Sequence, residues 1–406
     1  MGSLKKNLLI LSGGIEAVEG IKIAKNMGLK TIVCDKDTNA PGRKFADEFL
    51  IADIYDPQKI KKIISEYNKK NKIDGVITIA SDAVRSVSTV AKLLGIQGNS
   101  MKTAILSTNK LKMKKAFQKK RLPIPKFVEI KNVNELKKHI SQFKQGVLKP
   151  IDSRGSRGVV RIDNNSDLNQ MFEYSIKFSP SKKLILEEWI KGPQISTESL
   201  VISGKTYLCG IADRNYSNSE KTYPYFVEDG GETPSRFYPR IRSKIQKIMD
   251  IAVQALEIED GVIKGDIVMR NNQPYIIEIA TRLSGGFFST ITIPLVYKIN
   301  LIEKAILLSL GEKVEPPPKI LKHYCYQANR FIFPNPGKIQ KISIPDINKL
   351  PKFVKDFKIN VKVGDNIEAI QNHPMRKGSI LVVGNSKKQS IERVEKIRNR
   401  VKIEVK

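Results

Sequence analysis

Apolar positions along the first hundred residues follow two alternating patterns. Short uninterrupted apolar runs, such as "NLLIL" at 7–11 and "TIVC" at 31–34, predict buried strands. Between them, apolar residues recur at helical spacing, as in the stretch 15–28. The same patterns predict further strands at 48–53 and 75–80 and helices at 57–70 and 83–94. Strands that alternate with helices form a parallel sheet covered on both faces, so residues 1–103 are expected to form a Rossmann-like α/β domain.

Glycines after the first strand partly match a dinucleotide-binding fingerprint. Gly13, Gly14 and Gly20 precede or enter the first helix, and Asp35 ends the second strand. The full pattern G-x-G-x-x-G is absent, however. We therefore favour a Rossmann-like scaffold that binds no NAD.

Beyond residue 103 the pattern changes to longer strands and two β-hairpins, at 146–162 and 261–282. A run of three prolines further on marks a linker. We expect an α+β domain over 104–318, with a lobe at about 125–190 that carries the first hairpin. A small α+β domain is expected over 319–406.

The first hairpin turns through "LKPIDSRGSRGVVRID" (148–163), a segment dense in glycine and serine. Such a loop can bring its backbone N–H groups close to a ligand, and phosphate suits these donors. In a P-loop the lysine follows the last glycine and opens a helix. Here Lys149 precedes the loop and a strand follows it. The hairpin therefore predicts a phosphate site of another kind.

The second hairpin carries two acids on its opposite arms. With a turn at Asn271-Asn272, Asp266 and Glu278 face each other almost directly, on one side of the hairpin. Two carboxylates so placed repel unless a cation lies between them, and Mg²⁺ prefers oxygen ligands. Arg282 follows, and a guanidinium there could stabilise charge during phosphoryl transfer. The alternatives are two unrelated surface acids and a simple salt bridge from Arg282.

Composition narrows the classes of function. Lys and Arg number 71 against 41 Asp and Glu, a net charge of +30. The lysines are spread along helical stretches such as 59–72 and 110–121, which we interpret as solvated faces. Nucleic-acid binding is therefore a minor alternative to the attraction of anionic substrates. The cysteines, Cys34, Cys209 and Cys325, lie far apart, which argues against disulfides, zinc and a Cys–His nucleophile. No apolar run is long enough to span a bilayer, so a reducing, cytoplasmic setting is expected.

The order of these pieces resembles the ATP-grasp superfamily. A lysine in "NKLKMKKAF" is followed by the loop "LKPIDSRGSRGV", by "EEWIKGPQISTE" and by an acid twelve residues before the acid of "IEIATRLSGG". The chain is most similar to the carboxylate–amine ligases of the amino-acid ligase and carbamoyl-phosphate-synthase-like type. The resemblance spans residues 4 to about 315, and the C-terminal tail also resembles these ligases.

The resemblance implies roles for individual residues. The glycine hairpin becomes a flap over the phosphates of ATP, Glu187 takes the adenine amino group, and Asp266 and Glu278 hold Mg²⁺, with Mn²⁺ as an alternative. The implied nucleotide-binding residues are Lys110, Lys149, Ser153, Gly155, Ser156, Gly158, Glu187, Trp189, Ile190 and Gln194. Arg282 would act in catalysis. Candidates for substrate recognition are Arg214, Glu198, Ser284, Gly285 and the long loop 214–238, especially 223–235, which could also act as a lid.

Two positions depart from the family pattern. Gln194 stands where a ribose-binding glutamate is common, and Ala280 where many members have a metal-binding asparagine. The implied reaction is phosphorylation of a carboxylate by ATP, followed by attack of an amine on the acyl phosphate. Its partners would be a small carboxylic acid and an amine, and a homodimer stays open. A bicarbonate-phosphorylating carboxylase, a purine-pathway-type ligase and a non-catalytic nucleotide- or nucleic-acid-binding protein are the alternatives.

Overall fold

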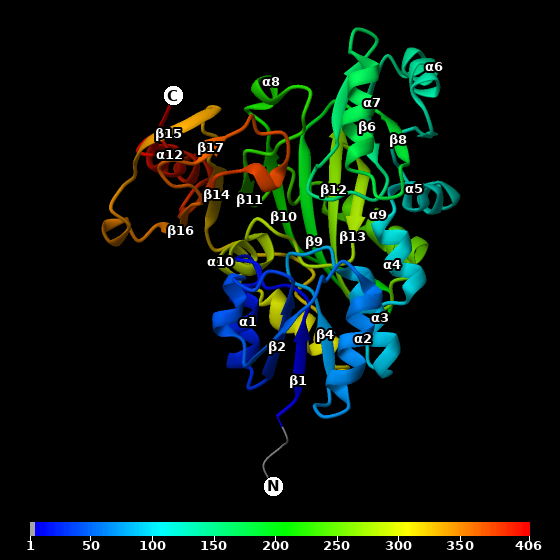
Figure 1. Ribbon diagram of the computed structural model, residues 1–406, viewed down its shortest axis with the longest axis vertical. Helices are drawn as coiled ribbons and strands as arrows, with labels where there is room; N and C mark the ends of the chain where they lie inside the picture. Colours follow the sequence, from blue (N-terminus) through cyan, green and yellow to red (C-terminus); the bar gives the residue numbers. More distant parts are fainter. Residues whose placement is uncertain (1–4) are drawn as a thin grey trace.

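The computed structural model describes residues 5–406, which contain four β-sheets with helices packed around them (Figure 1). The N-terminal sheet is parallel, in the order β3-β2-β1-β4, which confirms the predicted α/β arrangement. Its strands are β1 (Asn7–Ile10), β2 (Lys30–Asp35), β3 (Glu48–Ile51) and β4 (Gly75–Ile77). Its helices are α1 (Val18–Asn26), α2 (Pro57–Asn68) and α3 (Val84–Leu94).

Asp35, the acid of the partial dinucleotide fingerprint, forms a hydrogen bond within the protein. Its carboxylate accepts a hydrogen bond from the Gly13 N–H at 2.9 Å. Added at Gly13, a Cβ would lie 2.9 Å from that of Ala40, so the glycine is needed for close packing. Both residues thus support the loop after β1.

A small antiparallel sheet forms the lobe at the upper right of Figure 1, in the order β5-β8-β6-β7. Helices α6 and α7 pack on it around a separate apolar core. The strands are β5 (Phe127–Ile130), β6 (Gln145–Pro150), β7 (Val160–Asp163) and β8 (Leu184–Glu188), and the helices are α6 (Val133–Phe143) and α7 (Leu168–Lys177). Helices α4 (Met101–Thr108) and α5 (Lys110–Lys119) connect this lobe to the N-terminal sheet.

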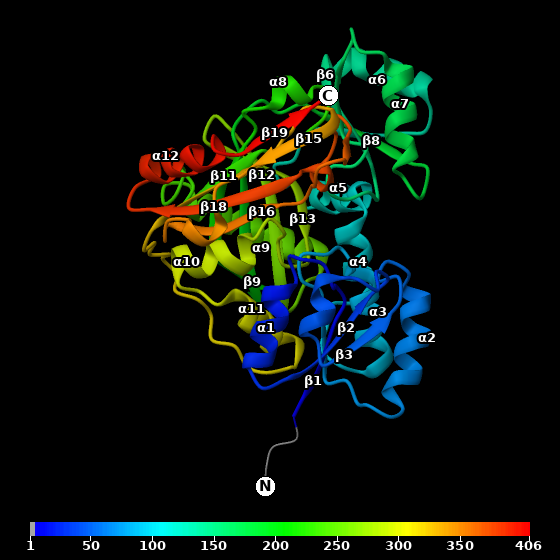
Figure 2. The same cartoon turned by 60° about the vertical axis from the view of Figure 1, so that its left-hand side comes forward.

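The large antiparallel sheet has eight strands, in the order β13-β12-β9-β10-β11-β14-β18-β16. Figure 2 shows β18 and β16 extending it, with α12 beside them. The strands are β9 (Gln194–Ile202), β10 (Lys205–Asn215), β11 (Gly230–Thr233), β12 (Gly261–Arg270), β13 (Gln273–Ala280), β14 (Tyr326–Phe331), β16 (Val354–Ile359) and β18 (Gly378–Gly384). The C-terminal segment thus continues the sheet that carries the second hairpin, and the domain limits at 103 and 318 stay predictions.

The remaining elements cover this sheet or extend its C-terminal end. Helices α9 (Arg242–Leu256), α10 (Ile293–Tyr297), α11 (Leu301–Ser309) and α12 (Lys387–Arg398) pack against strands. A third, smaller antiparallel sheet contains β15 (Gly337–Ser343), β17 (Asn366–Ile367) and β19 (Lys402–Val405). Within residues 5–406, no helix combines the length and the hydropathy needed to cross a membrane.

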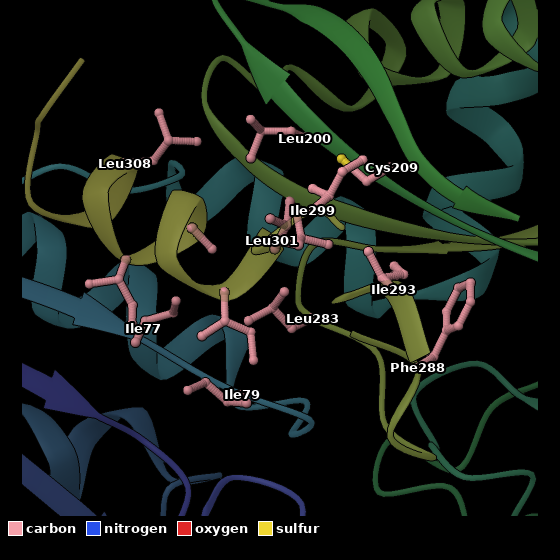
Figure 3. Close-up of a cluster of buried hydrophobic side chains, with 14 of the residues drawn as sticks. Ile77, Ile79, Leu200, Cys209, Leu283, Phe288, Ile293, Ile299, Leu301 and Leu308 are labelled. Carbon is pink, nitrogen blue, oxygen red and sulfur yellow. The ribbon is translucent and has the colours of Figure 1, made fainter. Parts of the chain in front are cut away.

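One apolar core joins the N-terminal sheet to the large sheet. Figure 3 shows Ile77 of β4 and the nearby Ile79 in the same cluster as Leu200 of β9 and Leu301 of α11. All four side chains are at most 8% exposed. Because burial of apolar surface is the main favourable term in folding, this shared core fixes the two sheets relative to each other.

The segment 214–238 is more ordered than the long loop expected from sequence. It contains a short helix, α8 (Ser219–Thr222), and the strand β11, which pairs with both β10 and β14. Glycine is a poor strand former, so "GGET" gave no strand signal. A Cβ added at Gly230 would lie 2.2 Å from the Asn329 carbonyl oxygen, so a side chain has no room there. Close packing between two neighbouring strands therefore overrides local propensity.

Candidate functional site

A cavity of about 960 Å³ lies where the N-terminal sheet, the small-sheet lobe, the large sheet and the C-terminal segment meet. Each unit contributes charged side chains to its wall. Asp82 comes from the N-terminal unit, Lys149 from β6, Asp266 from β12 and Arg376 from the C-terminal segment. No single sheet could build this site.

Lys110 lies at the start of α5, where the Asn109 side chain caps the helix. Its ammonium donates to the Ser153 carbonyl oxygen at 2.7 Å and lies 3.2 Å from Glu278 Oε1. The lysine is 8% exposed, and it thus connects the glycine loop to the acid of β13.

Glu187 of β8 is held by two lysines. Its Oε2 lies 2.8 Å from Lys149 Nζ and 3.5 Å from Lys114 Nζ. Burial would raise the pKa of Glu187, but Lys114 and Lys149 outweigh it and lower that pKa. Glu187 Oε1 is buried and has no hydrogen-bond partner among the described residues. A donor from a ligand in the cavity would satisfy this oxygen.

The glycine–serine loop between β6 and β7 lies over the cavity. Gly155 has φ +64° and Gly158 φ +73°, the left-handed region that glycine adopts readily. The backbone N–H groups of Gly155 and Ser156 find no acceptor within residues 5–406, so they are available to a ligand. Gly158 does not line the cavity, and a Cβ there would lie 2.8 Å from Pro150 Cγ.

This loop is latched to two other parts of the chain. The Arg154 guanidinium lies 3.4 Å from the Tyr55 ring centroid, in the N-terminal unit. On the other side the His373 N–H donates to the Gly155 carbonyl oxygen at 3.1 Å, and the His373 ring lies 3.3 Å from Ser156 Oγ. Burial, with Arg376 and Arg214 nearby, lowers the pKa of His373 well below its usual value. His373 is therefore neutral, and its Nε2 accepts the Glu228 N–H at 3.4 Å.

Asp266 and Glu278 are cross-strand partners in the β12–β13 ladder, which confirms the predicted pairing. The turn is at Asn271-Asn272, both with positive φ, as type I′ hairpins require. Asp266 also lies 2.7 Å from Lys264 Nζ and 3.1 Å from Arg214 Nη1. Burial would raise the pKa of Asp266, but these two cations lower it overall, so the carboxylate is charged.

The donor set fits a divalent cation only in part. No group of three or more His, Cys, Asp or Glu side chains that could hold a metal occurs in the part of the chain that the structure describes. Two facing carboxylates are hard oxygen ligands of the type that Mg²⁺ takes, and position 280 is an alanine. The protein could thus supply two ligands, with the rest from phosphate and water.

Arg282 and Glu198 support the wall of the cavity in different ways. Arg282 Nε donates to Asp82 Oδ1 at 2.8 Å, a bridge between the large sheet and the N-terminal unit. Glu198 is fully buried and does not line the cavity. It accepts hydrogen bonds from the backbone and side chain of Ser284 and from Ser289 Oγ, so it anchors the loop after β13.

The segment after β8 lines another wall of the cavity. Trp189, Ile190 and Gln194 all lie there. The Trp189 backbone N–H donates to the Gln145 carbonyl oxygen at 3.2 Å, so the main-chain group that Trp189 can offer a ligand is its carbonyl. Hydrogen bonding to a base edge would thus depend on the Trp189 carbonyl and the Ile190 backbone.

Most of the predicted site residues come together in this one cavity. Those that line it are Lys110, Lys149, Ser153, Gly155, Ser156, Glu187, Trp189, Ile190, Gln194, Arg214, Asp266, Glu278, Arg282, Ser284 and Gly285. Gly158 and Glu198 lie behind the wall. Arg214 is paired through two nitrogens with Glu228, at 3.0 and 2.7 Å, so its guanidinium is already engaged.

Sequence reasoning missed two sets of residues. The interpretation of the lysines at 110–121 as solvated is wrong for Lys110, which is 8% exposed, and for Lys114, which is fully buried and was not predicted as a site residue. Lys114 lies four residues after Lys110 and therefore on the same face of the helix, and this spacing was the sequence signal for its burial. His373, Arg376 and Lys358 of the C-terminal segment also line the cavity, and no local motif marks them.

Comparison with known proteins agrees with this geometry. Residues 107–286 match the ATP-grasp domain, residues 330–406 the L-amino acid ligase C-terminal domain 2, and residues 8–93 the PylC-like N-terminal domain. The formate-dependent phosphoribosylglycinamide formyltransferase of Prochlorococcus marinus (strain NATL2A) is 26% identical over 226 residues, 54% of this chain and 57% of that protein. The chain spans about half the length of the first curated relatives that it matches.

Solved structures share the fold over almost the whole chain. The L-amino acid ligase of Bacillus licheniformis superposes with a TM-score of 0.82 at 21% identity, covering 99% of both chains. The biotin carboxylase domain of the 2-oxoglutarate carboxylase of Hydrogenobacter thermophilus, solved with MgADP and bicarbonate, gives 0.75 at 16% identity, covering 98% of this chain and 90% of that one. The glycine loop, the lysines and the paired acids of the ATP-grasp segment line one cavity, and the chain therefore contains an ATP-grasp domain between a PylC-like N-terminal domain and an L-amino acid ligase C-terminal domain 2.

Proposed function

We propose that this chain is an ATP-dependent ligase that joins a small carboxylic acid to an amine through an acyl phosphate. One observation carries the proposal: the glycine–serine loop, Lys110, Lys149 and the Asp266–Glu278 pair all line the same cavity. Free loop amides and two lysines suit the phosphates of a nucleotide, and the paired acids suit the cation that accompanies them.

Nucleotide binding would use two walls of the cavity. The phosphates would lie under the loop amides of Gly155 and Ser156, near Lys110 and Lys149. The base would lie against the wall formed by Glu187 and the segment after it, where the unpaired Glu187 Oε1 accepts the adenine amino group. This assignment uses the buried polar atom that the protein leaves without a partner.

The chemistry needs no covalent intermediate on the protein. A substrate carboxylate oxygen attacks the γ-phosphorus, the bond to the β-phosphate oxygen breaks, and ADP leaves. The amine then attacks the acyl carbon, phosphate leaves, and the amine loses a proton. Lys110, Lys149 and Arg282 offer positive charge to the phosphoryl group as it transfers. Magnesium held by Asp266 and Glu278 would neutralise phosphate charge.

The acid is expected to bind on the side of the C-terminal segment. Arg376 lies over the Phe331 ring at 3.5 Å, and its Nε donates to the His373 carbonyl oxygen at 2.9 Å. The two terminal nitrogens of Arg376 have no acceptor within residues 5–406. Because Arg214 is already paired, Arg376 is the better candidate for an anionic group on a substrate.

Product analysis tests the proposal. Purified protein is screened for phosphate release with pairs of amino acids and other small acids and amines, and the spent nucleotide is separated by chromatography. We expect ADP and phosphate in equal amounts, dependent on both substrates. Hydroxylamine in place of the amine should give a hydroxamate. AMP and pyrophosphate as products would contradict the ligase assignment.

A further inference from the structure

Glu187 is shared between one lysine that lines the cavity and one that does not. Lys149, 9% exposed in its side chain, lies 2.8 Å from Glu187 Oε2 and faces the cavity. Lys114 approaches the same oxygen at 3.5 Å from behind, with a side chain that has no exposure at all. A ligand in the cavity can therefore meet Lys149 but has no access to Lys114.

Lys114 is held in place by the protein alone. It lies one turn after Lys110 on α5, and its ammonium also donates to the Ile276 carbonyl oxygen at 3.1 Å. Burial lowers the pKa of Lys114 to about 8, although Glu187 acts in the opposite direction. A fully buried ammonium is costly unless it is paired, and Glu187 is its carboxylate partner.

These contacts set a constraint on Lys149. An ammonium that turns towards a phosphate must leave Glu187, and a buried carboxylate left without a counter-ion would be strongly destabilised. We propose that Lys114 is a positioning residue that keeps Glu187 charged and in place, which allows Lys149 to move from Glu187 to the phosphates of the nucleotide. The inference rests on the proposed function, in which Lys149 binds phosphate.

A purely structural Lys114 would behave differently. If it only filled space under α5, its loss would lower stability without a specific effect on phosphate binding, and no change at Glu187 would reverse that effect. In the proposed arrangement, loss of Lys114 leaves Lys149 as the only counter-ion of Glu187 among these two lysines. Lys149 then stays paired with Glu187, and phosphate binding weakens although Lys114 itself does not contact the phosphate. Removal of the Glu187 charge then frees Lys149 again.

The test measures binding of inorganic tripolyphosphate, which has no base, by calorimetry. Lys114→Met should weaken binding by about tenfold, the value of one charge-assisted contact. The double variant Lys114→Met/Glu187→Gln should return to near the wild-type affinity. Lys115→Met, on the exposed side of the same helix, is the matched control and should leave the affinity unchanged. Thermal unfolding of each variant identifies any that does not fold.

Three outcomes separate the possibilities. Wild-type affinity in Lys114→Met, or a loss that Glu187→Gln does not reverse, overturns the inference while the proposed function stands. Unchanged affinity in Lys149→Met shows that Lys149 is not a phosphate ligand and overturns that assignment and the inference together. If Lys114→Met does not fold, Lys114→Gln replaces it, because an amide can still donate to the Ile276 carbonyl oxygen but carries no charge. Its affinity for tripolyphosphate should fall about tenfold and should recover when Glu187→Gln is added. An unchanged affinity, or a loss without recovery, overturns the inference.

Discussion

Asp266 and Glu278 face each other across the β12–β13 hairpin because Ile277 is bulged out of the ladder. Nearer the turn, Ile267 pairs with Ile276. An unbroken ladder would next pair Asp266 with Ile277 and turn Glu278 to the opposite face. The irregularity in register between Asp266 and Ile267 returns Glu278 to the cavity side, so a single extra residue places both acids in one site.

Replacement of Glu278 by Gln keeps the size of the side chain and removes its charge. We expect turnover to fall on the order of a hundredfold, because charge opposite Asp266 is lost where phosphate and metal would bind. ADP formation at low millimolar Mg²⁺ measures the effect. Glu259→Gln, the same change at an exposed acid, is the control. Near-normal activity in Glu278→Gln would remove Glu278 from the metal site.

Lys149→Ala should weaken ATP binding at least tenfold, since a charge-assisted contact is worth about 1.5–3 kcal/mol. The fold should survive, because Lys114 still lies 3.5 Å from Glu187. Calorimetric titration with ATP measures the affinity. Lys177→Ala removes an exposed lysine on α7 and controls for a general charge effect. An unchanged ATP affinity in Lys149→Ala would exclude this lysine from the nucleotide site.

His373→Ala should loosen the glycine–serine loop. The ring contacts Ser156 Oγ and accepts the Glu228 N–H, and loss of contacts worth about 1 kcal/mol should raise the open population about fivefold. The rate of limited trypsin cleavage after Arg154 and Arg157 measures this opening. His139→Ala, at a histidine of α6 outside the cavity, should digest at the wild-type rate. Equal digestion of both variants would show that the ring does not hold the loop.

Glu198→Gln should change how stability depends on pH. Burial raises the pKa of Glu198 from 4.5 to about 6, against the hydrogen bonds from Ser284 and Ser289. Between these values the folded chain binds more protons than the unfolded chain, so stability falls as pH rises through this window and then levels. The raised pKa corresponds to a loss of about 2 kcal/mol above pH 6.

Urea unfolding at pH 4 and pH 8 measures this effect. Glutamine does not titrate, so the free energy of unfolding of Glu198→Gln lacks this pH dependence. The difference in that free energy between the variant and the wild type should therefore shift in favour of the variant by up to about 2 kcal/mol from pH 4 to pH 8. Groups that titrate elsewhere cancel in the comparison between the two proteins. If the free energy of unfolding changed equally with pH in the wild type and in Glu198→Gln, the raised pKa of Glu198 would be contradicted.

The sequence by itself determined the features that depend on neighbouring residues. Alternating strand and helix patterns specified the parallel N-terminal sheet, and Asn271-Asn272 specified the turn of the second hairpin. Glycine density identified the loop after Lys149. Each is a local property, because backbone preference and side-chain period act over a few residues.

Only the tertiary structure decided which distant groups meet. The burial of Lys114 beside Glu187 requires α5 to pack between two sheets, and the latch of His373 on Gly155 joins residues more than two hundred positions apart. β11 forms only because β10 and β14 lie on both sides of it. Such contacts are absent from any local pattern, since their energy comes from burial and pairing between segments that the folded chain brings together.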